Sequence, residues 1–352
     1  GTMQRTDRGT VLSATGSGAA TLGPGALLWL SRSDVRAELD MADCIVAVEQ
    51  AFMQYARGQL PVAPGVLGAH FRDGGFHVKT AGAGLDPCYF AAKINANFPF
   101  NPTRHHLPTI QGVIALFDGA RGVPLAVMDS IEITILRTAA ASAIGAKQLA
   151  TAGAATVTIC GCGNQGRSHL RALALVRPIR RTFAVDANPS AAQAFSEELS
   201  KELGIEVSPA DSLAAAVHAS DICVTATPSR VPVFLASMLH PGLFIAAVGA
   251  DNEEKQELDP EVMRRAKVVT DLTAQTAAIG DLHPAIAAGV MTPADVHAEL
   301  GQVLVGERPG RTSDDEMFVF DSTGTALQDV AAAALVYERA VRSGRGAVVN
   351  LT

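Results

Sequence analysis

A glycine-rich turn at residues 161–166 is the part of the sequence whose residue types and spacing carry the most chemistry. An apolar, β-branched run ends at this GCGNQG turn, and a segment with helical spacing follows it directly. In such a setting Gly161 permits the tight turn, Gly163 lets the backbone approach a pyrophosphate, and Gly166 lets the helix pack close to the strand. The unpaired N–H groups of the helix N-terminus then face the phosphates. The turn therefore predicts a dinucleotide site, whose candidate residues here are Gly161, Gly163, Asn164, Gln165 and Gly166.

Asp186 closes the next apolar run, about 20 residues beyond the last glycine, which is the spacing of the dinucleotide fingerprint. A carboxylate there accepts hydrogen bonds from both ribose hydroxyls and repels a 2′-phosphate. Residues 187–190 contain no arginine that could bind such a phosphate, and Arg180 and Arg181 precede the run, at the far end of the predicted strand. The sequence therefore predicts NAD as the cofactor in preference to NADP.

Further candidates stand where later apolar runs end, because ligands of open α/β sheets bind at the carboxyl ends of the strands. Thr225 and Thr227 lie in the TATPS segment at 225–229, whose small and hydroxyl side chains suit a backbone beside a cofactor. Asp251 ends the following run, and a carboxylate beside a nicotinamide can move a proton to or from a substrate nitrogen. Aspartate after glycine is also ordinary turn chemistry. Asp251 is therefore either an acid/base catalyst or a turn or capping residue.

Three cations lie among small or apolar residues in the N-terminal half of the chain: Lys79, Lys93 and Arg137. Lys93 lies inside an apolar run, and Arg137 is expected to open a helix, where its charge opposes the helix dipole. Because a buried cation needs an anionic partner, each is expected to face either a structural aspartate or a substrate carboxylate. The adjacent His105 and His106 are expected in a polar loop, since neighbouring side chains rarely converge on one ion, and no metal site is predicted.

Length and composition describe a globular chain long enough for two domains, with 352 residues of which 48% are hydrophobic and 18% charged. The net charge is −7 and there is no Lys/Arg run, so a nucleic-acid partner is not expected. No apolar run reaches the length needed to span a bilayer, so no membrane association is expected. The five cysteines are odd in number and scattered, which predicts free thiols and a cytoplasmic location.

Periodicity predicts an α/β fold in which a Rossmann-type, doubly wound parallel sheet follows a mostly β N-terminal half. A helix is expected over 40–57 and a hairpin over 111–128, and His169 is expected on the protein surface. A short strand at 317–321 and a final helix at 327–343 are expected to rejoin the N-terminal domain. The strands expected in the parallel sheet are 156–160, 183–186, 205–207, 221–226, 243–249 and 267–271.

Taken together, ordered segments of the sequence resemble the ornithine cyclodeaminase/μ-crystallin family. The segments that carry the resemblance are KINANFPFN (93–101), LPTIQGVIALFD (107–118), GVPLAVMDSIEITILRTAAASA (122–143), GCGNQG (161–166), TATPS (225–229), AAVGADNEEKQEL (246–258) and FDSTGTALQD (320–329). The resemblance implies a central Rossmann domain, a β-rich α+β dimerisation domain built from both chain ends, and a homodimer. The division expected from it is a mobile lead-in at 1–27, a substrate-binding and dimerisation domain at 28–135 with 316–352, and an NAD-binding domain at 136–315.

The family's functional residues map onto this chain through the same motifs. Asp251 falls on the acid/base aspartate, Lys93 on the active-site lysine, and Arg137 on the arginine that holds the substrate carboxylate. Where many members carry a further arginine, this chain has Lys79 nearby, which joins Arg137 as a substrate-binding candidate. The positions that fall on the family's cofactor contacts are Gly161, Gly163, Gln165 and Asp186, with Ser322 and Thr323 near the nicotinamide.

The resemblance implies hydride transfer between nicotinamide C4 and the α-carbon of an amino or imino acid, and three functions follow. The first is an NAD(H)-dependent amino acid dehydrogenase or imine/ketimine reductase, acting on a small amino, imino or keto acid. It is favoured because Phe76 or His77 falls where cyclodeaminases carry an acid for the distal amine. The second is a redox-neutral, ornithine-type cyclodeaminase, an ammonia-lyase that uses NAD catalytically. The third is a non-catalytic, nucleotide-dependent binding protein of crystallin type, against which the retained Asp251, Lys93 and Arg137 argue.

Overall fold

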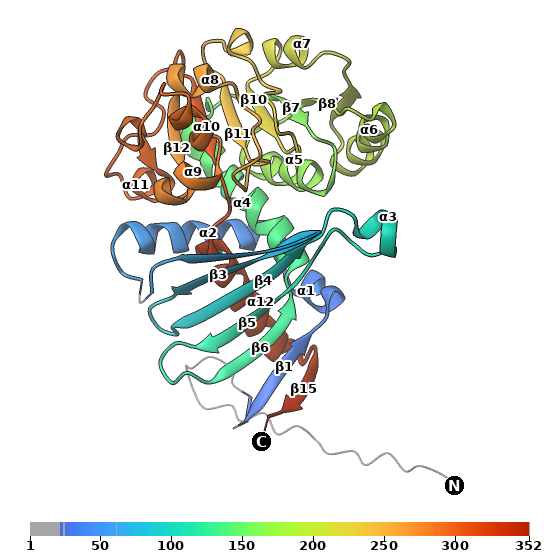
Figure 1. The fold of residues 1–352 in the computed structure, drawn as a ribbon, viewed down its shortest axis with the longest axis vertical. Helices are drawn as coiled ribbons and strands as arrows, with labels where there is room; N and C mark the ends of the chain where they lie inside the picture. The colour runs from blue at the N-terminus through green and yellow to red at the C-terminus, as the bar shows by residue number, and fades with distance from the viewer. Residues whose placement is uncertain (1–21, 24, 61, 352) are drawn as a thin grey trace.

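Two β-sheets, one above the other in Figure 1, organise the computed structural model of the chain. The structure describes residues 22–23, 25–60 and 62–351, so the lead-in predicted at 1–27 lies largely outside the described residues. The upper sheet has eight strands and the lower sheet seven. No helix of the described residues is long and apolar enough to cross a membrane.

The lower sheet combines the N-terminal strands with the last strand of the chain, in the order β15-β1-β6-β5-β4-β3-β2. All neighbours are antiparallel except β1 and β6. The hairpin predicted over 111–128 is confirmed: Asp118 Oδ1 accepts hydrogen bonds from the N–H groups of Ala120 (2.8 Å) and Arg121 (3.1 Å), which closes the turn. The strands are β1 (Ala26–Leu30), β2 (Gly65–Phe71), β3 (Gly74–Ala83), β4 (Tyr89–Asn97), β5 (Ile110–Asp118), β6 (Pro124–Asp129) and β15 (Ala347–Asn350).

Helices cover one face of this lower sheet, with α12 lying on β3 and β4. The helix predicted over 40–57 is α2, and the side chain of Asp40 caps it by accepting a hydrogen bond from Asp43 N at 2.9 Å. Its apolar stripe is buried, as the predicted helical periodicity requires. The helices of this part are α1 (Arg32–Glu38), α2 (Met41–Ala56), α3 (Asn101–His105), α4 (Ile131–Leu149) and α12 (Ala326–Ser343).

The upper sheet is parallel throughout and confirms the predicted doubly wound α/β class, with the order β13-β12-β14-β11-β10-β7-β8-β9. All six predicted strands are present in it. The strands are β7 (Thr156–Cys160), β8 (Arg181–Val185), β9 (Glu206–Pro209), β10 (Ile222–Thr225), β11 (Phe244–Ala247), β12 (Lys267–Thr270), β13 (Ala298–Glu299) and β14 (Phe318–Asp321). The α-helices are α5 (Asn164–Val176), α6 (Pro189–Leu203), α7 (Leu213–His218), α8 (Pro260–Arg265), α9 (Thr273–Ile279), α10 (Leu282–Ala287) and α11 (Leu300–Leu304).

The prediction that the strand at 317–321 rejoins the N-terminal domain is wrong. This strand, β14, lies inside the upper sheet, between β11 and β12. Its residues are buried on both faces, which is typical of an inner strand of a parallel sheet covered by helices. Only the segments after it, α12 and β15, return to the lower sheet.

Helix α4 is shared by the two domains, because it packs on α2 and α12 below and on α5, β11 and β14 above. It begins at Ile131, so Arg137 lies inside the helix and does not open it as predicted, and the expected domain boundary at 135/136 falls within the helix. Small residues make the close approach possible. A Cβ atom at Gly145 would lie only 3.1 Å from Phe320 Cδ1.

The inner position of β14 predicts that truncation of its buried Phe320 lowers the stability of the protein strongly. Phe320 is fully buried, so Phe320→Ala should lower the free energy of unfolding by about 3–5 kcal/mol in denaturant titrations. The matched control is Phe100→Ala, whose side chain is half-exposed and whose loss should cost less than about 1 kcal/mol. Equal losses in the two variants would contradict the placement of β14.

Candidate functional site

The glycine-rich turn joins β7 to α5, and each of its three glycines has a visible reason. Gly161 has φ +105°, and a Cβ atom there would lie 2.4 Å from the Ala226 carbonyl oxygen. A Cβ atom at Gly166 would lie 2.1 Å from the carbonyl oxygen of Gly161. At Gly163, the N-cap of α5, a Cβ atom would meet no described atom within 4 Å. The turn is therefore tight where it touches the fold and open where a pyrophosphate would approach, which fits a dinucleotide.

Asp186 follows β8 and contacts the glycine turn. Its Oδ2 accepts a hydrogen bond from Cys162 N, and its Oδ1 accepts one from Asn188 N, both at 2.8 Å. Arg181, by contrast, starts β8 and pairs with Glu206 at 3.0 Å, at the other end of the strand. Strand β8 therefore places no arginine beside Asp186, the residue at the ribose position of the fingerprint.

Two loops at the carboxyl ends of β10 and β11 are joined by a residue that the sequence did not single out, Glu257. Its Oε1 accepts hydrogen bonds from Thr227 N (2.6 Å) and Thr227 Oγ1 (2.7 Å). Its Oε2 accepts one from Gly249 N at 2.8 Å. Thr225 Oγ1 is buried without a hydrogen-bond partner among the described residues. The two threonines predicted at the cofactor thus lie at the carboxyl end of β10, and the hydroxyl of Thr227 is bonded to Glu257.

Asp251 lies two residues beyond Gly249 on the second of these loops, with its side chain half-exposed and paired to Lys255 Nζ at 2.7 Å. Its charge reaches the lower domain. Burial lowers the pKa of His77, as does Lys79, whereas Asp251 raises it. The contact of Asp251 with Lys255 fits both the catalytic and the capping hypothesis.

Lys93 and Arg137 share one buried carboxylate, Asp329 on α12. Lys93 Nζ lies 2.8 Å from Asp329 Oδ2, and Arg137 Nε lies 2.8 Å from Asp329 Oδ1. Arg137 Nη1 also donates to Gln328 Oε1 at 2.9 Å. We refer to Lys93, Asp329 and Arg137 as the ion triad. A structural aspartate, one of the two partners expected for these cations, is therefore present.

Two basic side chains share one carboxylate in the ion triad. Burial and the charge of Arg137 lower the pKa of Lys93 to about 7, although Asp329 opposes them. Burial opposes ionisation of Asp329, but Arg137 and Lys93 outweigh it and hold the pKa of that carboxyl below its ordinary value. One carboxylate thus faces two cations, with Lys79 nearby as a third. Two basic side chains on one carboxylate fit a further anion, such as the carboxylate of a small ligand.

Lys79 holds the turn between β14 and α12. Its Nζ donates to the carbonyl oxygens of Thr323 (3.3 Å) and Gly324 (2.7 Å). From the upper domain, Asp271 Oδ2 accepts from the N–H groups of the same two residues, both at 2.8 Å. Gly324 has φ +77°, and a Cβ atom there would lie 2.2 Å from Arg137 Nη1. The predicted pair Ser322 and Thr323 therefore sits directly beside the predicted substrate cations.

His169 is fully buried, so its expected surface position is wrong. Its Nε2 lies 2.9 Å from Ser142 Oγ on α4, and its Nδ1 lies 2.7 Å from the Gln165 carbonyl oxygen. Burial lowers the pKa of His169 to about 4, so the ring is neutral at physiological pH. His169 therefore ties the glycine turn to the helix shared by the two domains.

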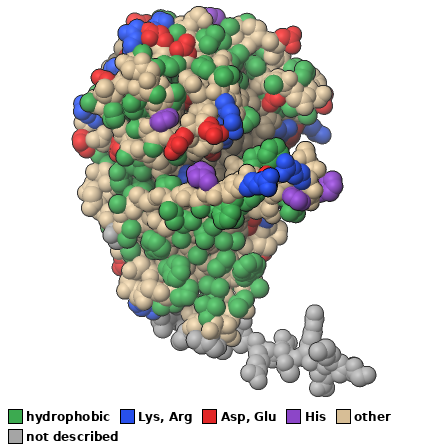
Figure 2. Space-filling model, in the orientation of Figure 1, with side chains coloured by type: hydrophobic (Ala, Val, Ile, Leu, Met, Phe, Trp, Pro, Cys, Tyr) green, Lys and Arg blue, Asp and Glu red, His purple; other side chains and the backbone are tan. Residues whose placement is uncertain are grey.

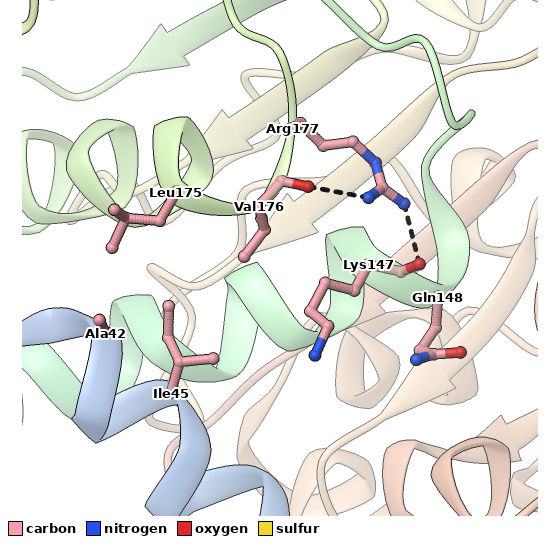
Figure 3. A pocket seen from close by; sticks show the side chains of 7 residues that line it. All are labelled: Ala42, Ile45, Lys147, Gln148, Leu175, Val176 and Arg177. Atoms are coloured by element: carbon pink, nitrogen blue, oxygen red, sulfur yellow. Dashed lines mark hydrogen bonds between the residues drawn. The ribbon is translucent and has the colours of Figure 1, made fainter.

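A groove between α2 and the ends of α4 and α5 lies apart from the candidate site (Figure 3). Arg177 borders it and donates from Nη2 to the carbonyl oxygens of Ala146 and Lys147, both at 2.8 Å. These bonds cap the C-terminal end of α4, which gives the arginine a structural role. Among the described residues, no group of three His, Cys, Asp or Glu side chains is placed to hold a metal ion.

The fold and the site define a two-domain protein with a dinucleotide-binding domain and the basic side chains of Lys79, Lys93 and Arg137 beside it. The chain belongs to the ornithine cyclodeaminase/mu-crystallin family, whose profile matches residues 27–344, and the resemblance drawn from the sequence is confirmed. An alanine dehydrogenase from Archaeoglobus fulgidus is 37% identical over 324 residues, which are 92% of this chain and 98% of that protein.

Two solved structures show the same architecture. An archaeal alanine dehydrogenase dimer with bound NAD matches with a TM-score of 0.88 and 37% identity, over 93% of this chain and 100% of that one. The Delta(1)-pyrroline-2-carboxylate reductase of Thermococcus litoralis, solved with NADH and L-proline, matches with a TM-score of 0.85 and 33% identity, over 91% and 99%. Both place the described fold among proteins of amino and imino acid chemistry.

The ion triad predicts that Asp329 is essential to stability. Asp329→Asn removes the carboxylate that Lys93 and Arg137 share and leaves the buried Arg137 without its counter-charge, so the free energy of unfolding should fall by about 3–5 kcal/mol. The control is Glu198→Gln, which removes an exposed partner of Arg167 and Arg171 and should cost less than about 1 kcal/mol. Denaturant titrations at pH 7.5 measure both. A loss for Asp329→Asn no larger than the control's would contradict the role of the triad.

Proposed function

We propose that the chain is an NAD(H)-dependent oxidoreductase that exchanges hydride with the α-carbon of an amino or imino acid. The observation that carries this proposal is the arrangement of the cleft. The glycine turn and the loops after β10 and β11 lie on one side, and the surplus positive charge around the ion triad lies on the other. Relatives named alanine dehydrogenase and Delta(1)-pyrroline-2-carboxylate reductase support this chemistry.

NAD, when bound, supplies the hydride acceptor or donor, and the residues of the upper domain hold it. Gly161, Gly163 and Gly166 with Asn164 and Gln165 take the pyrophosphate at the N-terminus of α5. Asp186 takes the ribose hydroxyls. The segments that border the nicotinamide contain Thr225, Thr227, Ser322 and Thr323.

The lower domain binds and orients the substrate. Arg137 and Lys93 hold the carboxylate of the amino or imino acid, with Lys79 adding positive charge at the same end of the cleft. Asp251 moves the proton: it protonates the nitrogen or a water in one direction and accepts a proton in the other. For this the carboxylate must leave Lys255, which its half-exposed position allows.

A net redox reaction is favoured over cyclodeamination by the residue that stands where cyclodeaminases carry an acid for the distal amine. His77 lies on β3, two residues from Lys79, so both point to the same face of the sheet. Neither Phe76 nor His77, the two candidates for this position, has a carboxylate that could bind a distal ammonium group, and burial and Lys79 lower the pKa of His77. The substrate class that fits is a small amino, imino or keto acid without a second amine.

A homodimer is supported by the outer face of the lower sheet, which is strongly apolar where Figure 2 shows it. Leu67, Ile94 and Val113 lie side by side in register across β2, β4 and β5, through Val78 of β3, and all three are exposed. An exposed apolar face of this kind is typical of a protein–protein interface.

A cytoplasmic location is proposed from the five cysteines, which are all free, as is usual in a reducing compartment.

Turnover assays with an Asp251 variant test the proposed function. The wild-type protein should oxidise NADH with an α-keto acid plus ammonia or methylamine, or with a cyclic imine. Asp251→Asn should lower turnover by about 10²–10⁴-fold with every substrate, because it removes the basic group and keeps the shape. The matched control is Glu253→Gln on the same loop, which should remain near wild type.

Two measurements separate the outcomes of this test. Absorbance at 340 nm follows net redox change, and product mass with ornithine or lysine detects cyclisation without it. Near-normal turnover in a folded Asp251→Asn protein would return the residue to its capping role. Cyclisation of ornithine without absorbance change would replace the dehydrogenase by the lyase.

Asp186 predicts the choice between the two nicotinamide cofactors. Fluorescence titration should show NADH binding at least about tenfold more tightly than NADPH, about 1.4 kcal/mol, because the carboxylate repels a 2′-phosphate. Asp186→Ser should narrow this ratio, and Asp211→Ser, an exposed aspartate after β9, should leave it unchanged. Equal affinities for the two cofactors in the wild-type protein would contradict the prediction.

A further inference from the structure

Glu257 is a fully buried carboxylate at the carboxyl edge of the upper sheet. Its two oxygens accept three hydrogen bonds, from the N–H and hydroxyl of Thr227 and from the N–H of Gly249. The donors belong to different loops, one after β10 and one after β11. One side chain therefore sets the distance between the two loops that border the proposed nicotinamide site.

The packing around Glu257 leaves no freedom for this contact to shift. Glu257 is fully buried. A Cβ atom at Gly249 would lie 2.5 Å from Glu257 Cδ and 2.3 Å from the Thr227 carbonyl oxygen. Only glycine fits at this point, so the two loops and the carboxylate form one rigid unit, and Asp251 leaves that unit two residues later.

Two further buried carboxylates hold Glu257 in place. Asp281 Oδ1 accepts from Glu257 N at 2.8 Å and from Leu258 N at 2.9 Å. Asp321, at the end of β14, accepts from Leu282 N at 2.8 Å and from Asp281 N at 3.2 Å. The series runs from the residue before Ser322 to the loop of Asp251. It connects the segments expected on the two sides of the nicotinamide.

The series is expensive to maintain, which argues that its geometry serves a purpose. None of Glu257, Asp281 and Asp321 forms a salt bridge with a described residue, so their partners are backbone N–H groups and, for Glu257, also the hydroxyl of Thr227. Burial raises the pKa of Glu257, although the bonds from Thr227 and Gly249 lower it. Burial and the charge of Glu257 raise the pKa of Asp281 to about 7. An apolar side chain would avoid these costs but could not join the two loops.

We infer that Glu257 is a positioning residue, which holds Asp251 at the height of the nicotinamide by joining the loops after β10 and β11. The inference rests on the proposed function, because Asp251 needs positioning only if it moves a proton. Glu257 itself touches neither the substrate nor the reacting atoms; it acts through Gly249 and Thr227.

The first test is Glu257→Gln. Its amide oxygen can still accept from Thr227, but its NH₂ group faces the N–H of Gly249, so the second loop is released. Turnover should fall by about 10–100-fold, the usual effect of a small misplacement of a catalytic group. The KM for substrate and the affinity for NADH should stay within about threefold of wild type. The control Glu261→Gln, an exposed glutamate on α8 four residues away, should leave all three unchanged.

A double variant separates positioning from a purely structural role. In an Asp251→Asn background, Glu257→Gln should cost less than about threefold more in turnover, because its effect passes through Asp251. If the two losses multiply in full, or if KM rises in place of a fall in kcat, Glu257 does not act through Asp251. Unchanged kcat in folded Glu257→Gln would also overturn the inference.

Two further measurements keep the test decisive. Should Glu257→Gln fail to fold, Thr227→Val removes one of the three bonds, and its kcat should fall by about three- to tenfold at constant KM. Unchanged kcat would overturn the inference.

Hydrogen–deuterium exchange tests the same contact without an activity assay. In Glu257→Gln it should speed up at residues 248–252. If the wild-type protein turns over none of the keto acids, imines and amino acids named above, the proposed function fails. Unchanged exchange at residues 248–252 in Glu257→Gln would then also reject the role of Glu257 in joining the two loops.

Discussion

The buried ion triad of Lys93, Asp329 and Arg137 is the interaction on which the rest of the site depends. Its members come from β4, α12 and α4, so a single carboxylate joins the lower sheet, the helix that returns from the upper sheet and the helix shared by both domains. Removing such charges from water costs several kcal/mol per ion, and only close partners offset that cost. The three elements are therefore required to meet at Asp329.

The turn between β14 and α12 transmits this constraint to the nucleotide-binding domain. Asp271 from above binds the N–H groups of Thr323 and Gly324, and Lys79 from below binds their carbonyl oxygens. Gly324 lies against Arg137, where no side chain fits. The same short segment is thus fixed by both domains.

The parts of the fold that sequence analysis predicted correctly are those that a local pattern specifies. Strand, glycine turn, helix and acid recur within one βαβ unit, and the six predicted strands each form an apolar run with turn residues at its ends. The errors have a common cause. The apolar residues of β14 fit either sheet, and burial of His169 depends on Ser142 of another helix. Arg137 was placed at a helix start because the preceding residues, 131–136, lack a marked cap.

The sequence by itself determined the glycine turn and the family, and it predicted Asp186, Lys79, Lys93, Arg137 and Asp251 as site residues, because each lies in a short segment with a recognisable pattern. Asp329 and Glu257 lie within the same motifs, yet nothing in their residue type distinguished them from exposed acids. Only the tertiary structure decided that Asp329 neutralises Lys93 and Arg137, 236 and 192 residues away, and that Glu257 joins two strand-end loops. Partners so distant in the chain share no periodicity, and the low-dielectric interior that makes their contacts strong exists only once the sheets have packed.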